Sequence, residues 1–274
     1  MSVDEKLCFE VPVYVAVTSP FTNVVFDNEE PFQLSLEDVN SGNYDRLKFC
    51  RTTLAVSGDI EAMNERNMAV IITYSGCMLF PRLPGLEKQS VIDACNAILL
   101  RLLFGGIEFD AVVPEDVGYG SVCGTGYFML SGGCSGSNYQ QLMHLQQDEA
   151  TANDLISLMS PRYYSQKEFN TTLQDGLVIT TKIPEVNPSI FLNGMTFFKT
   201  YQLAPSLVFS WSTAETLIGK IWSEKVVPSG SGIAGRRKFI ESNSWQAANK
   251  TEVLFQIGLI SEELYDLFRE FRTS

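Results

Sequence analysis

Short runs of β-branched and aromatic residues are the first pattern along this chain, and such runs predict strands. They cover residues 11–17, 68–80, 107–113 and 177–181. A stretch rich in glycine and serine, residues 118–138, holds one further apolar run at 127–130. For this stretch we expect a loop, a short strand and a second loop.

Two stretches among these strands have the pattern of helices instead. Residues 88–104 are apolar on nearly every side, with Ser90 as the expected start and Gly105-Gly106 as the stop. That pattern predicts a core helix that is buried on most of its faces. Residues 148–159 predict a second helix.

From about residue 186 onward the apolar positions follow helical spacing. A first helix opens at Pro188 and carries Leu192, Met195 and Phe198 on its apolar side. A longer amphipathic helix begins with Pro205 in its first turn, a position that proline tolerates. Its apolar stripe consists of Leu207, Trp211, Ala214, Ile218, Ile221 and Trp222.

Two more helices follow a loop at residues 228–238 that is rich in glycine and serine. The third helix carries Trp245, Ala248, Thr251 and Phe255 and ends at Gly258. The fourth begins at Ser261 as its N-cap, and one face presents Leu264, Leu267, Phe268 and Phe271. The fold class is therefore α+β, with a mixed α/β domain over residues 1–185 and an all-α helical bundle over residues 186–274.

The last helix reaches Ser274 without a Gly, Asn or Pro to end it. Two interpretations stay open. The helix frays at a natural terminus, or the native chain continues beyond this residue. We expect the bundle over 186–274 to be incomplete at its C-terminal end.

The net charge of the chain limits which partners it can bind. The chain has 20 Lys and Arg against 32 Asp and Glu, a formal net charge of −12, which repels a phosphate backbone and argues against general nucleic-acid coating. Residues 236–274 hold six basic and six acidic side chains, so all of the net negative charge lies upstream. If any part of the chain meets RNA, it is this C-terminal part.

Cysteine usage and hydropathy indicate a cytoplasmic protein. The most apolar segment, residues 91–104, is too short to span a bilayer and contains charged side chains, and the first six residues lack the apolar stretch of a secretory signal. With one histidine and no CxxC pair, neither a zinc site nor a disulfide framework is indicated. We expect no membrane contact, no metal and no cofactor, and we expect reduced thiols at Cys8, Cys50, Cys77, Cys95, Cys123 and Cys134.

Two candidate ligand sites have plainer explanations. Glycines clustered over residues 118–126 let backbone amides approach a phosphate, but the spacing is not GxGxxG and no GK[ST] follows. A glycine-rich turn or hairpin is favoured there. Glu108 and Asp110 would face one way on a strand, but a third metal ligand is missing.

His144 is the only imidazole in the chain and would have to serve as the base for any Cys or Ser nucleophile. Cys134 and Ser137 are its nearest candidates in the sequence. Because no G-x-S-x-G motif accompanies them, a surface or cap histidine is the favoured interpretation, with a hydrolase as a remote third class of function.

Basic residues at the end of the glycine-rich loop, Arg236, Arg237 and Lys238, would contact phosphates without reading sequence. A solvated loop end is the plainer account. Glu215 lies at the expected edge of the buried face of the long helix, where a carboxylate requires a partner. We expect it to pair with a Lys or Arg side chain.

Three segments of the C-terminal part carry a family resemblance. They are the long-helix sequence FSWSTAETLI at 209–218, FQIGLI at 255–260, and SEELYDLFREFR at 261–272. Through them, residues 186–274 resemble the HEPN superfamily of helical bundles, in particular the ApeA-like and related bacterial versions.

The resemblance implies a metal-independent ribonuclease that assembles as a homodimer and acts in phage defence or as a toxin. Its Arg-x(4–6)-His element is not in this chain, so no catalytic residue carries over. Arg236, Arg237, Lys238, Arg269 and Arg272 are the candidates for RNA contact, with Glu215 as a polar support.

The leading hypothesis is a HEPN-type defence or toxin-like protein that lacks its catalytic motif in this chain. In it, the first domain senses a protein or a phage-derived trigger. The alternative is a non-enzymatic binding module for a protein or ligand that dimerises through its helical bundle. Undercovered aromatic faces on the last helices are the surfaces expected to meet in the dimer.

Overall fold

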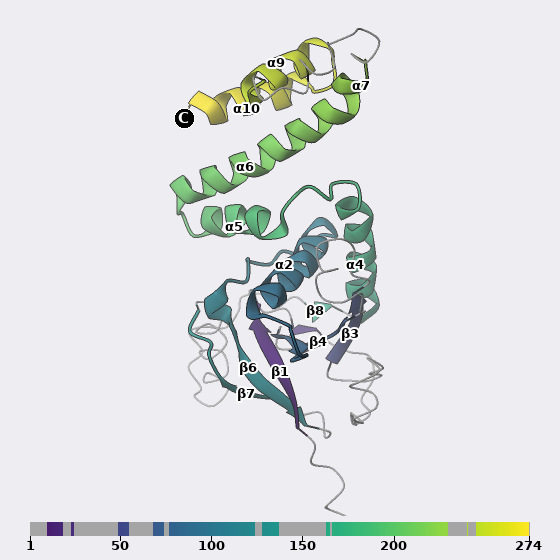
Figure 1. Cartoon of the computed structure of the whole chain (residues 1–274), viewed down its shortest axis with the longest axis vertical. Helices are drawn as coiled ribbons and strands as arrows, with labels where there is room; N and C mark the ends of the chain where they lie inside the picture. The colour runs from purple at the N-terminus through teal and green to yellow at the C-terminus, as the bar shows by residue number, and fades with distance from the viewer. Residues whose placement is uncertain are drawn as a thin grey trace, which may run out of the picture. The chain divides into compact units, whose positions relative to one another are not determined.

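The computed structural model describes residues 10–18, 23–24, 49–54, 68–73, 77–123, 128–136, 163–164, 166–229, 240 and 245–273 (Figure 1). The chain divides into two compact units, Met1–Thr180 and Thr181–Ser274. Helices and an antiparallel sheet together make this an α+β protein, as the sequence predicts. Each unit is described by itself.

A six-stranded antiparallel sheet forms the first unit, in the order β3-β4-β5-β1-β6-β7. Its strands are β1 (Glu10–Val17), β3 (Phe49–Leu54), β4 (Met68–Thr73), β5 (Cys77–Pro81), β6 (Val117–Cys123) and β7 (Phe128–Gly132). A short parallel pair, β2 (Asn23–Val24) and β8 (Tyr163–Tyr164), is separate from it. The predicted strand at 68–80 is thus two strands, β4 and β5, that pair with each other.

Strand β1 is the centre of the sheet, with β5 on one side and β6 on the other. All its residues from Val13 to Val17 are buried, so both faces of the strand are covered. This explains why its sequence is a continuous apolar run rather than an alternation of apolar and polar residues. Tyr14 adds a polar anchor, because its hydroxyl donates to the Leu86 carbonyl at 3.0 Å.

Helix α2 (Lys88–Phe104) packs on the sheet, where the Cys95 thiol lies 3.4 Å from the Met78 sulfur (Figure 1). The predicted core helix is confirmed, but it begins two residues before Ser90. Glu87 is the N-cap with an extended backbone and makes no side-chain cap, so the Ser90 hydroxyl is not what starts the helix. The stop at Gly105-Gly106 is confirmed.

Two predicted strands are wrong. Residues 107–113 belong to no strand, and the amide and carbonyl of Val112 bond to the Asn96 side chain at 2.9 and 3.0 Å. The apolar composition there reflects burial, since Ile107 and Phe109 are buried. Residues 177–180 end helix α4 (Gln166–Thr180), and the following turn contains Thr181.

Glycines set the contact between α2 and α4. A Cβ atom on Gly176 of α4 would lie 1.8 Å from the Arg101 carbonyl oxygen, and one on Gly105 would lie 2.2 Å from the Thr172 carbonyl oxygen. The two backbones therefore approach more closely than any larger residue permits. The Asp175-Gly176 pair, a turn signal in the sequence, is a helix–helix contact in the structure.

The glycine-rich stretch holds more strand than predicted, because β6 and β7 pair across it as antiparallel neighbours. Short 3-10 helix η3 (Pro114–Asp116) leads into β6. The predicted helix at 148–159 lies outside the described residues.

Helices make up the described part of the second unit. Helix α5 (Pro188–Lys199) starts at Asn187, whose side chain accepts from the Ile190 amide at 3.1 Å. Helix α6 (Leu203–Ile221) continues through a π-helical turn, η5 (Trp222–Val226), into α7 (Val227–Ser229). Helices α9 (Ala247–Gln256) and α10 (Glu262–Thr273) complete it, with the Ser261 hydroxyl capping α10 through the Leu264 amide.

The core of the second unit lies where the far end of α6 meets α9 and α10. It consists of Ile218, Trp222, Val227, Ile240, Leu254 and Ile260. The Trp222 indole donates to the Ile240 carbonyl at 3.1 Å and packs on Trp245 at 4.9 Å between ring centroids. Of the stripe predicted for α6, Ile218 and Trp222 are buried, whereas Trp211 is half-buried.

Close packing also joins α5 to α6. The Ser206 hydroxyl donates to the Gly194 carbonyl at 2.8 Å, and a Cβ on Gly194 would lie 3.0 Å from the Ser210 hydroxyl. Leu192 is fully buried in this hairpin. Among the described helices of the chain, none is long and apolar enough to cross a membrane.

Candidate functional site

The glycine cluster is explained by strand packing. Gly118 and Gly120 lie in β6, while Gly124 and Gly126 lie outside the described residues. A Cβ on Gly118 would stand 2.4 Å from the Gly132 carbonyl oxygen. The glycine is needed for the close approach of the chain, which supports the hairpin interpretation over a phosphate loop.

Cys134 is a poor nucleophile in its surroundings. Its thiol lies 3.6 Å from the Asp116 carbonyl oxygen and 3.9 Å from that of Val15. Burial and the nearby Asp116 carboxylate raise the pKa of the Cys134 thiol to about 11, with Lys88 acting in the opposite direction. The thiol is therefore protonated at neutral pH. Ser137, the alternative nucleophile, and His144, the candidate base, lie outside the described residues.

Glu108 and Asp110 are the two carboxylates that the sequence pattern does not support as metal ligands. Glu108 is exposed and Asp110 is half-buried on the extended segment after α2. Across the described part of the chain, no group of three His, Cys, Asp or Glu residues is placed to hold a metal ion.

The RNA-contact candidates are only partly described. Arg236, Arg237 and Lys238 lie outside the described residues, and Arg272 belongs to α10 without a described side chain. Arg269 is exposed, with a guanidinium nitrogen 3.3 Å from the Asp266 carboxylate.

Helix α10 as a whole does not favour RNA. It contains two arginines against four carboxylates, those of Glu262, Glu263, Asp266 and Glu270. A phosphate backbone near Arg269 would therefore meet a surface of net negative charge.

Glu215 is exposed on α6. It lies about 60° around the helix from the buried Ile218, because each residue turns an α-helix by about 100°, so it borders the buried side of the helix. Among described residues it has no ion-pair partner. Lys220, five residues further along α6, pairs with Glu185 at 2.7 Å and Glu224 at 3.1 Å.

A small groove opens between α6, α9 and α10. It is lined by Trp211, Ala248, Thr251, Tyr265, Phe268 and Arg269. Its volume of about 220 Å³ includes open solvent. Small-molecule sites occupy roughly 300–1,000 Å³, so this groove is too small for a cofactor or nucleotide.

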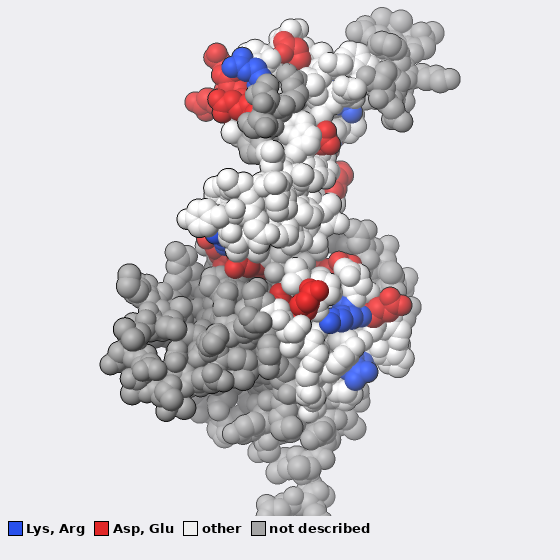
Figure 2. All heavy atoms as spheres, turned by 90° about the vertical axis from the view of Figure 1, so that its left-hand side faces the viewer, with Lys and Arg blue, Asp and Glu red and all other residues white. Residues whose placement is uncertain are grey.

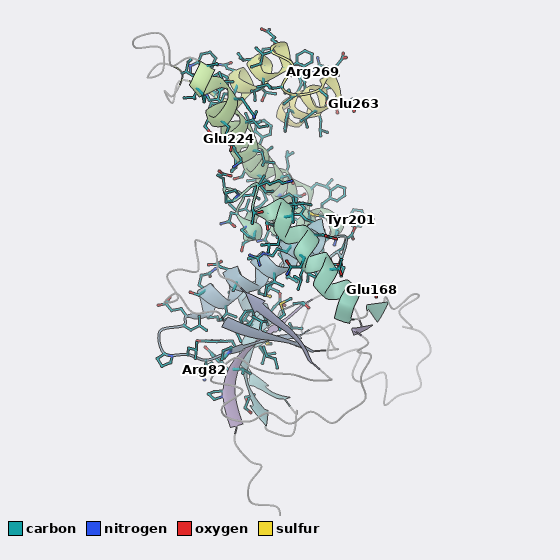
Figure 3. The ribbon with its side chains drawn as sticks, turned by 90° about the vertical axis from the view of Figure 1, so that its right-hand side faces the viewer. Arg82, Glu168, Tyr201, Glu224, Glu263 and Arg269 are labelled. Carbon is teal, nitrogen blue, oxygen red and sulfur yellow. The ribbon has the colours of Figure 1, made fainter. Side chains whose placement is uncertain are left out.

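The most unusual surface lies at the connection between α5 and α6. Three large apolar side chains there are mostly exposed: Phe198 at 66%, Tyr201 at 88% and Leu203 at 61%. We call these three residues the α5–α6 patch. Figure 3 labels Tyr201 at the edge of the helical hairpin. Exposed apolar groups gathered in this way mark interaction surfaces.

The backbone at Tyr201 is strained. Tyr201 has a φ of 58°, and it is the one non-glycine residue with positive φ among those the structure describes. Its amide donates to the Phe198 carbonyl at 3.1 Å, and the Gln202 amide donates to the Phe197 carbonyl at 2.8 Å. These two bonds form the Schellman motif, whose left-handed position is usually occupied by glycine.

Two other helices of the chain end in the same way with glycine in that position. Gly106, with φ 104°, follows α2, and Gly258, with φ 72°, follows α9. The residue after each glycine donates its amide to the carbonyl five residues back, as Gln202 does: Ile107 donates to Leu102, and Leu259 donates to Leu254. A bulky residue with this backbone is a genuine outlier, and such outliers concentrate at functional sites.

Sequence reasoning missed this surface because Phe198 falls at a helical spacing that predicts burial. The available signal was charge: over residues 186–214, Lys199 is the only charged side chain. Figure 2, which faces the α5–α6 connection, shows the surface of these helices as largely uncharged. An amphipathic helix normally turns a charged face to solvent, and this hairpin has too few charged residues to form one.

Comparison with protein-family models, with curated proteins and with solved structures gives no match to this chain.

Proposed function

We propose that this chain is a non-enzymatic binding module that holds another protein chain against the helical hairpin α5–α6. One observation carries the proposal. Tyr201 is 88% exposed and adopts a strained left-handed backbone at a helix end where glycine would serve the fold better. Folding gains nothing from this side chain in water, so a contact with a partner accounts for its presence.

The chemistry of the patch supports a protein partner. Phe198 and Leu203, which lie three residues before and two residues after Tyr201, are also mostly exposed, and aromatic residues are enriched at the centres of protein interfaces. Lys199 is the one cation in this stretch of the chain, which is too little to attract a nucleic acid to a protein of net charge −12.

Photo-crosslinking tests the proposal. A benzophenone amino acid placed at Phe198 is expected to form a covalent adduct with a protein chain in the cells that make this protein. The matched control places the same group at Val178, which is 56% exposed on α4 in the first unit. Adducts that form equally at both positions, or at neither, would contradict the proposal.

A second candidate function follows the resemblance to HEPN-type defence and toxin proteins. In it, the C-terminal part binds RNA and the first unit binds a trigger, and this chain lacks the catalytic motif. The helices over residues 188–273 agree with the all-α bundle that this resemblance implies, although the net negative charge of α10 weighs against RNA at that helix. This chain should leave RNA intact in a nuclease assay and should bind single-stranded RNA in a fluorescence anisotropy titration. Cleavage of RNA would refute the binding-module proposal.

A further inference from the structure

Helix α10 has a wider apolar face than the second unit covers. Tyr265 and Phe268 pack against the core of the unit. Leu264 and Leu267 belong to the same apolar side of the helix, yet they are 37% and 47% exposed. Because each residue turns an α-helix by about 100°, Leu264 lies about 40° from Phe268 and about 60° from Leu267. The two leucines therefore continue the apolar face beyond the part that is buried.

The residues around these leucines have the seven-residue pattern of a coiled-coil helix. Leu264 is at position a and Leu267 is at position d. Glu263 and Glu270 are then both at position g, and both are exposed. Leu267 lies four residues after Glu263 and three before Glu270, so these side chains are neighbours on the helix surface. We call the four residues the α10 strip.

One flank of the α10 strip is negatively charged, and the other is closed. Glu263, labelled in Figure 3, forms no ion pair with any residue that the structure describes. Arg269 lies about 160° around the helix from Leu267 and pairs with Asp266 at 3.3 Å, so it does not neutralise this flank. On the other flank, position e is Phe268, which packs against the core. A helix that packs on the strip therefore meets carboxylates along its one open side.

We propose that the α10 strip docks a basic amphipathic helix of another protein. Its apolar residues at a and d pack on Leu264 and Leu267, and its Lys or Arg side chains face Glu263 and Glu270. Packing of an amphipathic helix on an apolar surface is a recurrent mode of recognition, and charges at e and g select the partner. This inference goes beyond the proposed function, because it concerns a different helix and does not depend on the α5–α6 patch.

Charge favours a basic partner over a second copy of this chain. In an antiparallel pair of helices the g positions face each other, so Glu263 of one copy would meet Glu270 of the other. Like charges at this distance oppose the contact, and two chains of net charge −12 also repel at long range. A helix with basic residues at the same positions is attracted by both effects.

Fluorescence anisotropy of a labelled peptide tests the proposal on the full chain. The probe is a peptide of three heptads with Leu at a and d and Lys at e and g. Its matched control carries Glu in place of every Lys. The lysine peptide should bind saturably with one peptide per chain, whereas the glutamate peptide should not bind.

Matched variants separate the α10 strip from a general attraction between a cationic peptide and an acidic chain. Leu267→Ser should weaken binding of the lysine peptide by about tenfold, whereas Val178→Ser, at an exposed valine on α4, should not change it. Glu263→Lys should weaken binding by about threefold, because an attraction becomes a repulsion. Glu215→Lys makes the same charge change at an exposed glutamate on α6 and should have a smaller effect.

Folding of the variants is checked separately. All three tryptophans, Trp211, Trp222 and Trp245, lie in the second unit, so their fluorescence reports its unfolding. Because Leu267 is largely exposed, Leu267→Ser should unfold at nearly the same denaturant concentration as the parent chain. Weaker binding by a variant that unfolds like the parent supports the proposal.

Three results would overturn the inference: no saturable binding at about 1 mM lysine peptide, equal binding of both peptides, or equal weakening by the strip variants and their controls. Light scattering without peptide examines the other occupant. A dimer that Leu267→Ser dissociates would assign the strip to a second copy and reject the basic partner. Crosslinking from Phe198 reports on the α5–α6 patch alone, so failure of the peptide experiment leaves the proposed function standing.

Discussion

At the scale of single residues, Tyr201 and Gly258 give the chain an internal comparison. Both occupy the left-handed position after a helix, with φ values of 58° and 72°. An L-residue with a side chain is disfavoured there by roughly 1–2 kcal/mol relative to glycine. The helix end after α9 avoids this cost, whereas the one after α5 accepts it and exposes an aromatic ring as well. Because glycine serves the fold at the end of α9, we attribute the tyrosine at the end of α5 to function rather than to folding.

Cys134 carries a prediction about pH. Because its pKa in the folded chain is raised to about 11 from an ordinary 9.0, iodoacetamide should label it slowly at pH 8 and faster as the pH approaches 11. The thiol is held protonated in the fold, so its contribution to stability is present below pH 9 and is lost as the pH rises through 11.

Denaturant titrations at pH 8 and pH 10.5 measure this contribution. The parent chain should lose more stability between the two than Cys134→Ser, which has no thiol to ionise. Equal losses would show that burial and the Asp116 carboxylate do not raise the pKa of the Cys134 thiol in the folded chain.

At the scale of elements, the glycines of α4 and α6 have opposite roles. Gly176→Ala should destabilise the first unit by about 1–3 kcal/mol, because its Cβ would lie 1.8 Å from the Arg101 carbonyl oxygen. Gly219→Ala in α6 meets no atom within 4 Å and should stabilise the helix by about 0.5–1 kcal/mol. Thermal unfolding followed by circular dichroism at 222 nm gives the melting temperature of each variant. Melting temperatures that shift in the same direction for both variants would contradict the close contact at Gly176.

The same elements show how far sequence patterns reach. Helices α2, α5, α6, α9 and α10 were predictable because their spacing, prolines and caps are local signals. Residues 107–113 were not, because an extended buried segment has the composition of a strand even when Asn96 supplies its hydrogen bonds. Gly176 misled in the opposite direction, since a sequence cannot distinguish a turn glycine from one that lets two helices touch.

Candidate sites were less predictable than elements. In the sequence, Arg269 stood out for its charge and Glu215 for its place on the long helix, but the first lies beside Asp266 and the second is exposed without a described ion-pair partner. The surface at Tyr201 depends on one backbone angle and on side-chain exposure, and neither is encoded in local spacing. The low number of charged residues over 186–214 was the only feature of the sequence that indicated this surface.

At the scale of the whole molecule, net charge predicts how association responds to salt. Two copies of net charge −12 repel at long range, and the repulsion is screened within about 10 Å at 0.1 M salt. Raising sodium chloride from 0.05 to 0.5 M should therefore strengthen any contact between two copies that is made through apolar side chains. Sedimentation equilibrium across this range measures the effect. A contact built on ion pairs would instead weaken.

The position of β1 at the centre of the sheet has a consequence for biosynthesis. This strand is made first, but its partners β5 and β6 follow tens of residues later, and Tyr14 pairs with Tyr119 only after about a hundred more residues have been added. On the ribosome, β1 waits with both edges unsatisfied while the rest of the unit emerges. A nascent chain of this kind is vulnerable to aggregation, so its yield in the cell should depend on how quickly translation delivers β6.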